Sequence, residues 1–409
     1  MGRAKEFPKK TLLSSRGSYE VKIKTINGSF DFAVNRYETS DGHSNWLRLT
    51  DTALSEHHES EMLQQFSLRY ATMLSYERVS RLVHERCGNT KLSDQRIHHL
   101  VQEKAAAITV AQAVLIRDSQ AESREVQAVA VDIYDKESAE VMWLSDGVCV
   151  SEQKAVRNKQ SKDGKERTTT NIAMLERADG SYQTIIAGCA SEAVSLYRAE
   201  VWREYGSKAS QLPVVAISDG ARSIKKETKQ VFGEAVTHIL DWYHLEAKVY
   251  QLMTQIAPNK KEKDDSNELL INALWKGETA KAIKHLQAIE AKNVTKQNEL
   301  VGYLEKNKDY TIDYERRHKA NKLIGSGRME KQNDVMVSQR QKRKGMSWSK
   351  KGSLSLALVT AHLHSHVIDS IRPGSQEVLG HDPSDRSIVR PPRHVPSQPP
   401  SKHELEPKT

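Results

Sequence analysis

The sequence predicts an α/β protein in which a mixed sheet is flanked by helices. Apolar runs of strand length are grouped between residues 126 and 187, and beyond them similar runs alternate with helical segments. Residues 245–320 are almost wholly helical in composition and rich in Lys, Glu, Asn and Leu. A final helix pair covers roughly residues 326–343 and 347–371. We therefore expect one sheet, interrupted by an all-helical insertion.

Length and composition narrow the class of protein. The chain has 409 residues, enough for two or three domains, and carries a formal net charge of +9. This basic balance favours a polyanionic partner. No apolar run approaches the ~18–20 residues of a membrane span, and none follows the basic N-terminus as in a secretory signal. Three widely spaced cysteines argue against a disulfide framework, so we expect an intracellular protein that faces nucleic acid.

Residues 1–65 predict a small β-containing region. Tyr19–Lys24 and Phe30–Val34 alternate polar and apolar side chains, as short strands do. The dipeptide Asn27-Gly28 between them is typical of a hairpin turn.

Residues 66–125 predict a helical region. The apolar spacing breaks at Cys87–Thr90 and resumes in a helix for which Ser93 is the expected N-cap. Two helices around a break that contains glycine are consistent with a helix-turn-helix.

Residues 126–244 predict the first part of the α/β domain. The expected strands are Val126–Tyr134, Glu140–Leu144, Gln183–Ala187, Pro213–Ser218 and Thr237–Leu240. The expected helices are Glu192–Tyr205 and Ala221–Phe232, and a polar hairpin-like segment covers Lys154–Arg167. After the helical insertion, residues 321–371 complete the domain. The Pro-rich tail, 372–409, has no period, and we expect it to be disordered.

Three acidic residues have the sequence context of metal ligands. Asp132 lies at the end of an apolar run, Asp219 follows a predicted strand, and Glu330 lies on a predicted helix. Carboxylates at the carboxyl ends of strands line the crevice where α/β sheets bind ligands. Two Mg²⁺ ions held ~3.5–4 Å apart activate an attacking hydroxyl and stabilise the leaving oxygen of a phosphodiester. A single acid at a strand end is more often a cap or a surface turn, but three of them, with a basic strip directly beside the third, favour a metal site. Asp135 is the alternative to Asp132.

Asp241 and His244 follow the last predicted strand and are auxiliary candidates. Asp241 is a fourth acid near the same sheet edge. His244 is either a proton shuttle or substrate contact, or a structural histidine that caps the next helix.

The segment from Lys322 to Lys351 carries nine basic residues against two acidic ones, a net charge of +7. A charge run alone is usually a solvated helix face. Here its density and the aromatic side chain within it favour a track along a phosphate backbone. The residues expected to contact DNA are Arg328, Arg340, Lys342, Arg343, Lys344 and Trp348.

Two motif blocks resemble the DDE transposases of bacterial insertion sequences, most nearly their Kra-type group. One block is Ile217–Ile224 (ISDGARSI) with Ile239–His244 (ILDWYH), and the other is Gly325–Trp348 (GSGRME…QRQKRKGMSW). The resemblance covers roughly residues 66–370. It implies an RNase H-like catalytic domain whose acidic triad binds two Mg²⁺ ions.

The resemblance also implies roles for particular residues. It gives the second acid as Asp219, the third as Glu330, and the first as Asp132, although the glycines usual around the first aspartate are missing. It implies that 245–320 is an insertion between the second and third acids. It further implies that Ser93–His99 begin a recognition helix, whose candidate DNA contacts are Ser93, Gln95, Arg96 and His99.

These implications predict a DNA transposase that cleaves and joins phosphodiesters at insertion-sequence ends, with Mg²⁺ or, in its place, Mn²⁺. Its expected partners are double-stranded DNA, as terminal inverted repeats and target, and further copies of itself. Its expected location is the bacterial cytoplasm, at the nucleoid and away from any membrane. Two alternatives stay open. One is an RNase H-like metal-dependent nuclease or resolvase without strand transfer, and the other is a catalytically inactive DNA-binding repressor derived from a transposase.

Overall fold

The computed structural model describes residues 13–39, 44–46, 58–122, 124–153, 166–342 and 346–371. Most of the expected hairpin-like segment 154–167 and the whole tail 372–409 lie outside these residues. The chain divides into two units, 1–367 and 368–409. Of the second unit, the described residues are the last turn of a helix.

A three-stranded antiparallel sheet forms near the N-terminus, in the order β1 (Leu13–Thr25), β2 (Gly28–Thr39) and β3 (Ser44–Trp46). The expected hairpin around Asn27-Gly28 is confirmed, and both of its strands are longer than predicted. Its turn rests on the residues after the next helix pair, because the Ser29 N–H donates to Asn89 Oδ1 at 2.6 Å.

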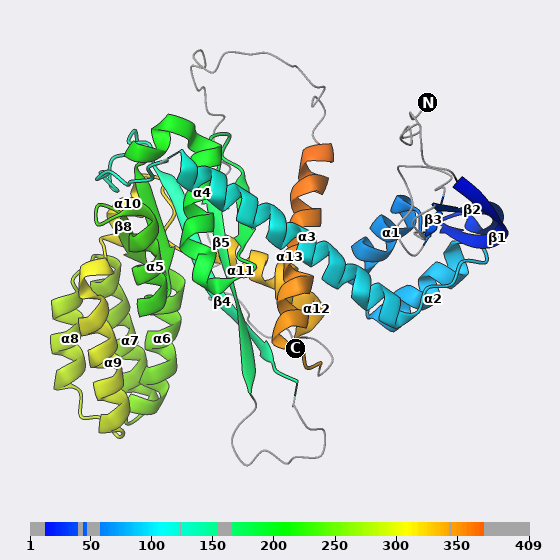
Figure 1. The fold of residues 1–409 in the computed structure, drawn as a ribbon. Helices are drawn as coiled ribbons and strands as arrows, with labels where there is room; N and C mark the ends of the chain where they lie inside the picture. The colour runs from blue at the N-terminus through cyan, green and yellow to red at the C-terminus, as the bar shows by residue number, and fades with distance from the viewer. Residues whose placement is uncertain are drawn as a thin grey trace. The chain divides into compact units, whose positions relative to one another are not determined.

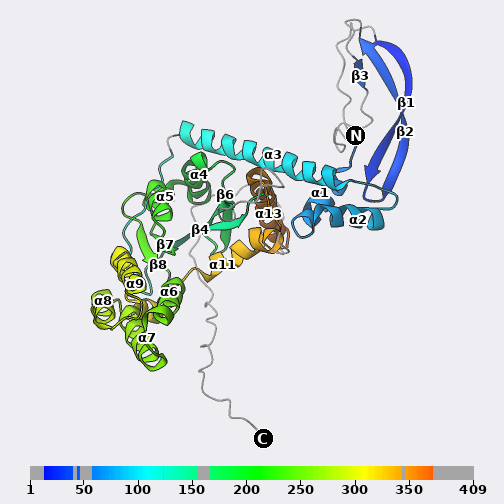
Figure 2. The same ribbon diagram turned by 90° about the horizontal axis from the view of Figure 1, so that it is seen from below.

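Three helices follow: α1 (Glu61–Ala71), α2 (Tyr76–Arg86) and α3 (Asp94–Ala121). Each begins at a serine N-cap (Ser60, Ser75 and Ser93) whose hydroxyl accepts a backbone N–H three residues on. The connection from α2 to α3 covers residues 87–93, which is longer than the three- to four-residue turn of a helix-turn-helix. Figure 2 shows α3 running from α1 and α2 to α4 (Ala193–Tyr205).

The central sheet has five strands in the order β6-β5-β4-β7-β8. Their bounds are β4 (Val141–Ser151), β5 (Arg167–Glu176), β6 (Tyr182–Ile186), β7 (Val214–Ser218) and β8 (Thr237–Leu240). Strands β4, β5 and β6 form an antiparallel meander, whereas β7 and β8 run parallel to β4. The helices α4 and α5 (Arg222–Phe232) provide the crossovers of the parallel part. The predicted mixed α/β architecture is therefore confirmed.

Two strand predictions differ from the structure. Residues 126–134 are not a sheet strand, since Ala128 makes an isolated bridge to Leu212 and the chain then turns at residues 133–134. Strand β4 does not end at Leu144 but continues to Ser151, because β5 pairs with it along that whole length.

The two faces of the central sheet pack against different helices. Trp143 of β4 contacts Tyr197 of α4 and Phe232 of α5 at ring-centroid distances of 5.2 Å. Its neighbour Leu144 belongs to the other core cluster, which includes Met329. Alternate residues along β4 therefore face opposite layers.

The segment between β8 and residue 320 is almost wholly helical, as the composition of 245–320 predicts. Helices α6–α9 lie side by side as a bundle (Figure 1). Their bounds are α6 (Trp242–Ile256), α7 (Lys260–Trp275), α8 (Thr279–Ala288) and α9 (Val294–Asn307), followed by α10 (Tyr314–Lys319). The final helix pair is also observed, as α11 (Gly327–Asn333), a π-helical turn (Asp334–Ser338), α12 (Gln339–Gln341) and α13 (Lys350–Ile371). Short 3₁₀ turns occupy Ala190–Glu192, Gly206–Gln211 and Lys308–Tyr310.

A buried ionic cluster fixes α10 to the turn that precedes β4. Glu140 accepts from Arg317 at 2.9 Å and from Lys322 at 3.2 Å, and all three side chains are almost fully buried. The remaining Arg317 donors reach the carbonyl oxygens of Ile133 and Leu323. This cluster holds the chain immediately before residues 324–326, which lead into α11.

Candidate active site

Two aspartates lie side by side at the centre of the sheet. Strands β4 and β7 are adjacent and parallel, and Leu144 pairs with Ile217. Asp146, within β4, and Asp219, the residue directly after β7, each stand two residues beyond that pair, so they come at the same level along neighbouring strands, which lie about 4.8 Å apart. Asp146 shares the side of the sheet taken by Leu144 and Ile217, because side chains alternate along a strand, and the charge of Asp219 acts on it.

The shared side is the one against which α11 packs. Leu144, Ile217 and Met329 belong to one core cluster. The two aspartates therefore lie where the apolar part of this layer ends, and α11 carries the third acid, Glu330, to the same place.

Asp146 is half-buried and hydrogen-bonded through both of its carboxyl oxygens. Its Oδ2 accepts from Nδ2 of Asn333 at 2.6 Å, and its Oδ1 accepts from the Gly147 N–H at 2.7 Å. Burial raises the pKa of the Asp146 carboxyl, and the negative charge of Asp219 raises it further, which outweighs the hydrogen bonds. The two carboxylates are thus close enough to repel each other.

Asp219 and Glu330 are the exposed members of the group. Oδ1 of Asp219 accepts from the Ala221 N–H at 2.8 Å and so covers the start of α5. Glu330 lies three residues before Asn333 on α11, which puts both side chains on one helix face. Asn333 therefore reaches Asp146, while Glu330 extends towards His244. The distance between Oε1 of Glu330 and Nε2 of His244 is 3.8 Å.

Asp241 organises the floor of this region. It follows β8, is almost fully buried, and is the N-cap of α6, because its Oδ1 accepts from the His244 N–H at 3.0 Å. Its Oδ2 accepts from both the N–H and the hydroxyl of Ser326, which begins the helical turn of α11. Burial alone would raise the pKa of Asp241, but the hydrogen bonds outweigh it and lower the pKa, so the carboxylate stays ionised.

His244 is the cation of the group. Its Nδ1 lies 3.4 Å from Oδ2 of Asp241. The pKa of His244 is raised to about 9, chiefly by this carboxylate. Burial lowers the pKa, and the charges of Glu330 and Asp219 raise it further. At neutral pH one imidazolium therefore lies among four carboxylates, counting Asp146.

The structure brings Asp146 beside Asp219, whereas no described contact joins Asp132, the expected first acid, to either of them. Asp132 is exposed, and its carboxylate accepts from the Tyr134 N–H at 2.9 Å, as a turn residue does. Asp135 likewise accepts from the Glu137 N–H and the Ser138 hydroxyl. The apolar run before Asp132 lies beside the start of β7 and leaves the sheet there, so its acid ends in a turn. Asp146 takes the central position instead.

The expected recognition residues at the start of α3 have different environments. Ser93 is the N-cap, and its hydroxyl accepts from the Arg96 N–H at 3.1 Å. The Arg96 guanidinium is held by buried Glu59 and by Glu103, so it is not free to contact DNA. Gln95 and His99 are exposed, with their side chains 3.5 Å apart.

The expected DNA track between Lys322 and Lys351 is wrong for two of its residues. Arg340 is 5% exposed, donates to the Ala71 carbonyl, and lies between the rings of Tyr76 and Trp348. Trp348 is 9% exposed and donates to the Gln341 carbonyl. Both serve the packing of α12, because an arginine stem and an indole ring bury large apolar areas.

The other described members of that track, Arg328 and Lys342, are not buried. Arg328 and Lys342 are exposed, and Arg328 lies over the ring of Tyr182. Arg343 and Lys344 lie outside the described residues.

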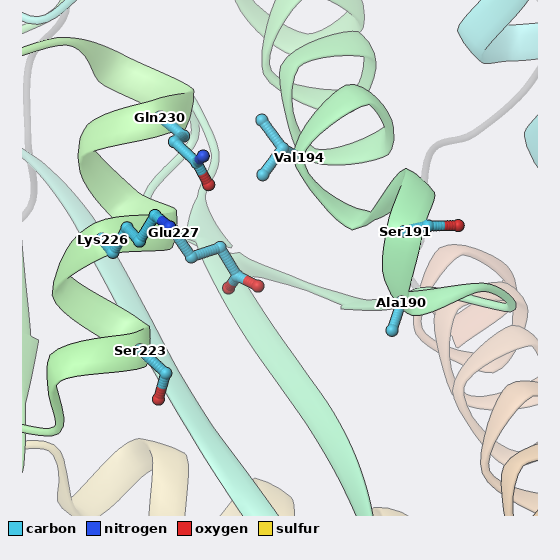
Figure 3. A pocket seen from close by; sticks show the side chains of 7 residues that line it. All are labelled: Ala190, Ser191, Val194, Ser223, Lys226, Glu227 and Gln230. Carbon is cyan, nitrogen blue, oxygen red and sulfur yellow. The ribbon is translucent and has the colours of Figure 1, made fainter.

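A cavity of about 550 Å³ lies between the start of α4 and α5 (Figure 3). Ser191 and Val194 line one side, and Lys226, Glu227 and Gln230 of α5 line the other. No acid of the candidate site is among its lining residues, so it is separate from that site.

The side chains of the candidate site are oxygen-rich, as a Mg²⁺ site requires. Besides the carboxylates, Oδ1 of Asn333 is buried and has no hydrogen-bond partner in the described structure. Within the described residues, however, no three His, Cys, Asp or Glu side chains are already close enough together to hold a metal ion. The donor chemistry fits a divalent cation, and Glu330 would have to move inward to complete its shell.

Comparison with known proteins places the chain in a family. The uncharacterised protein family UPF0236 matches residues 13–375, which covers both sheets and every acid described above. The chain belongs to this family. The match includes Asp146, Asp219 and Glu330 but assigns a role to none of them.

Further comparisons add little to the family match. No curated protein matches the chain significantly. Among solved structures, it is similar to the Drosophila P element transposase strand transfer complex, with a TM-score of 0.24 and 9% identity, over 76% of this chain and 80% of that one. This similarity is weak, and no residue role is taken from it. Within the described part of the chain, no helix has the length and apolar character that crossing a membrane requires.

Proposed function

We propose that this member of UPF0236 is a metal-dependent DNA transposase in which Asp146, Asp219 and Glu330 hold the metal. The observation that carries the proposal is the placement of Asp146 on β4 beside Asp219, which directly follows the adjacent parallel strand β7, with Glu330 on the helix that packs against this part of the sheet. Three antiparallel strands followed by two parallel ones, with one acid on the central strand β4 and another directly after its neighbour β7, support the RNase H-like fold that the motif blocks imply.

The donor set supports Mg²⁺ or Mn²⁺ as the cofactor. Asp146 and Asp219 repel each other, and a divalent cation between them would convert this repulsion into attraction. When bound, two such ions would activate the attacking water or 3′-hydroxyl and stabilise the leaving oxygen.

The remaining residues of the site position these carboxylates. Asn333 donates to Oδ2 of Asp146, and the Gly147 N–H donates to Oδ1 of the same carboxyl group. Asp241 accepts from Ser326, the N-cap of α11, and thereby fixes the start of the helix that carries Glu330. His244, oriented by Asp241, has its Nε2 on the Glu330 side and can hold a proton there.

The test compares three matched substitutions, Asp146→Asn, Asp219→Asn and Asp132→Asn, in the full chain. The assay measures cleavage of duplex DNA that contains the flanks of the gene, and joining of the product to a plasmid, in Mg²⁺ or Mn²⁺. We expect the first two variants to lose cleavage and joining and the third to keep both. Undiminished cleavage by Asp219→Asn would overturn the proposal, as would a wild-type chain that never cleaves.

Joining separates the transposase from its nearest rival. A chain that cleaves in an Asp146-dependent manner but never joins pre-cut ends is a nuclease or resolvase. A chain that binds the flanking DNA without cleaving it is a DNA-binding repressor. The exposed Gln95 and His99 at the start of α3 are the proposed contacts for such binding in all three cases.

A further inference from the structure

A group of unpaired cations lies where α5 begins and α9 ends. Arg222 is the first residue of α5, three residues after Asp219, and Lys306 is next to the last residue of α9. Both are exposed, and neither has a carboxylate partner among the described ion pairs. With the buried Lys225 they form what we call the α5–α9 basic surface.

Direct contacts hold the two helix ends together. The Lys225 ammonium donates to Oδ1 of Asn307 at 3.2 Å and lies 3.8 Å from the centre of the Tyr310 ring. Gly220, in the turn after Asp219, is so close to Asn307 that a Cβ there would come within 2.6 Å of its Oδ1. The end of α9 is therefore packed against the turn that carries Asp219.

No carboxylate is hydrogen-bonded or ion-paired to these three cations in the described part of the chain. Lys225 is 9% exposed, and its partners are a neutral amide and an aromatic ring, whereas buried lysines are ordinarily paired with a carboxylate. Burial lowers the pKa of Lys225, and Lys306 and Arg222 lower it further, against the opposing charges of Asp219 and Asp309. The pKa of His238 falls to about 4, first through burial and then through the charges of Lys229, which is paired with Glu234, and of Lys225.

We propose that the α5–α9 basic surface binds the phosphate backbone of the DNA strand that enters the site at Asp219. The inference rests on the proposed function and locates the DNA path within it. A polyanion approaching four carboxylates is repelled unless cations flank its path, and Arg222 and Lys306 are the unpaired, exposed cations placed beside Asp219. The path replaces the part of the expected track that Arg340 and Trp348 cannot provide, since both are buried.

The test uses the double variant Arg222→Ala/Lys306→Ala of the full chain. Fluorescence anisotropy measures its affinity for a labelled duplex of arbitrary sequence between about 50 and 200 mM salt. We expect binding to weaken ~10-fold on every sequence and the slope of log affinity against log salt to fall by about 2, one unit for each lost phosphate contact.

Two further variants serve as controls. Lys261→Ala/Lys284→Ala removes two exposed cations from α7 and α8, which carry no residue of the surface, and should bind like wild type. Arg222→Lys/Lys306→Arg keeps both charges and should restore the affinity and most of the salt slope.

A measurement on the wild-type chain does not depend on any variant folding. Lys306 is exposed, so an amine-acylating reagent should label it in the free chain, and bound DNA should protect it while Lys261 and Lys284 stay labelled. Unprotected Lys306 together with an unchanged salt slope in the alanine variant would overturn the surface while leaving the proposed function intact. A wild-type chain that binds no DNA at any salt would overturn the proposed function itself.

Discussion

The Glu140 cluster and the candidate site are two groups of charged side chains with opposite ratios of positive to negative charge. In the Glu140 cluster one carboxylate receives two cations, and every member is almost fully buried. In the site at the sheet centre four carboxylates surround the single cation of His244, and several of them are exposed. The first cluster is saturated with hydrogen bonds, whereas the second has an excess of negative charge.

This difference separates a group that stabilises the fold from one prepared for a ligand. Removing a partner from a saturated buried cluster leaves an uncompensated charge and costs stability. Removing a carboxylate from a repelling group relieves strain and costs function instead. The following substitutions test whether the two clusters behave in these opposite ways.

The largest effect is expected for Asp146→Asn. DNA cleavage should fall by about 10²–10³-fold, the size of effect that loss of one charge-stabilising group has on another enzyme. The melting temperature should stay the same or rise, because repulsion with Asp219 disappears. A thermal melt beside the cleavage assay checks both, with Asp132→Asn as the exposed control that keeps activity. A large loss of stability in Asp146→Asn would place this residue with the structural cluster.

Glu140→Gln should have the opposite profile. The change leaves Arg317 and Lys322 buried without a counter-charge, so the free energy of unfolding should fall by about 3–5 kcal/mol. Urea denaturation measures the loss, and the exposed Glu137→Gln in the same turn is the control. A variant as stable as the control would contradict the structural role of the cluster.

Gly325→Ala probes the geometry between the two clusters. A Cβ at residue 325 would overlap the Tyr243 ring, whereas a Cβ at Gly327 meets nothing within 4 Å. We expect Gly325→Ala to cost about 1–2 kcal/mol, since the Tyr243 ring must shift. Gly327→Ala should be neutral or slightly stabilising, because it adds a helix-favouring residue at the start of α11. Equal stability of the two variants would show that the Tyr243 ring does not constrain residue 325.

The smallest effect concerns His244 and pH. Its pKa is raised to about 9 in the folded chain, so its stabilising contribution is complete below about pH 6.5 and is lost as the pH rises towards 9. With metal removed by a chelator, wild type should lose up to about 1 kcal/mol relative to His244→Asn over this range, since the side chain is 40% exposed and screened by solvent. Parallel pH profiles of the two proteins would show that the carboxylates do not hold the imidazolium.

Part of this site could be predicted from the sequence, and part of it could not. Asp219 and Asp241 could be recognised because each directly follows a compact apolar strand. Asp146 was missed because Ser145-Asp146-Gly147 resembles a turn, and the pairing with β5 that extends β4 through it is a long-range interaction. One local signal was available: Leu144–Gly147 (LSDG) repeats the pattern of Ile217–Gly220 (ISDG).

The helices were more predictable than the strands, because helical periodicity is local and strand pairing is not. The run before Asp132 satisfied the strand pattern, yet the pairing position beside β7 is taken by β4. The prediction that Arg340 contacts DNA failed for a related reason. The charge density of its segment is a local property, whereas its burial depends on Ala71 and Tyr76, which are distant in sequence.

That enclosure bears on how separable the parts of the protein are. The guanidinium of Arg340 uses the Ala71 carbonyl and the Tyr76 ring as partners, although it stands ten residues after Glu330. A fragment that begins at the central sheet lacks these partners and leaves a charged group exposed against apolar surface. The N-terminal helices are therefore an integral part of the scaffold that supports Glu330, and the molecule is not modular at that boundary. Arg340 can reach its observed environment only once the segment that carries Ala71 and Tyr76 is in place.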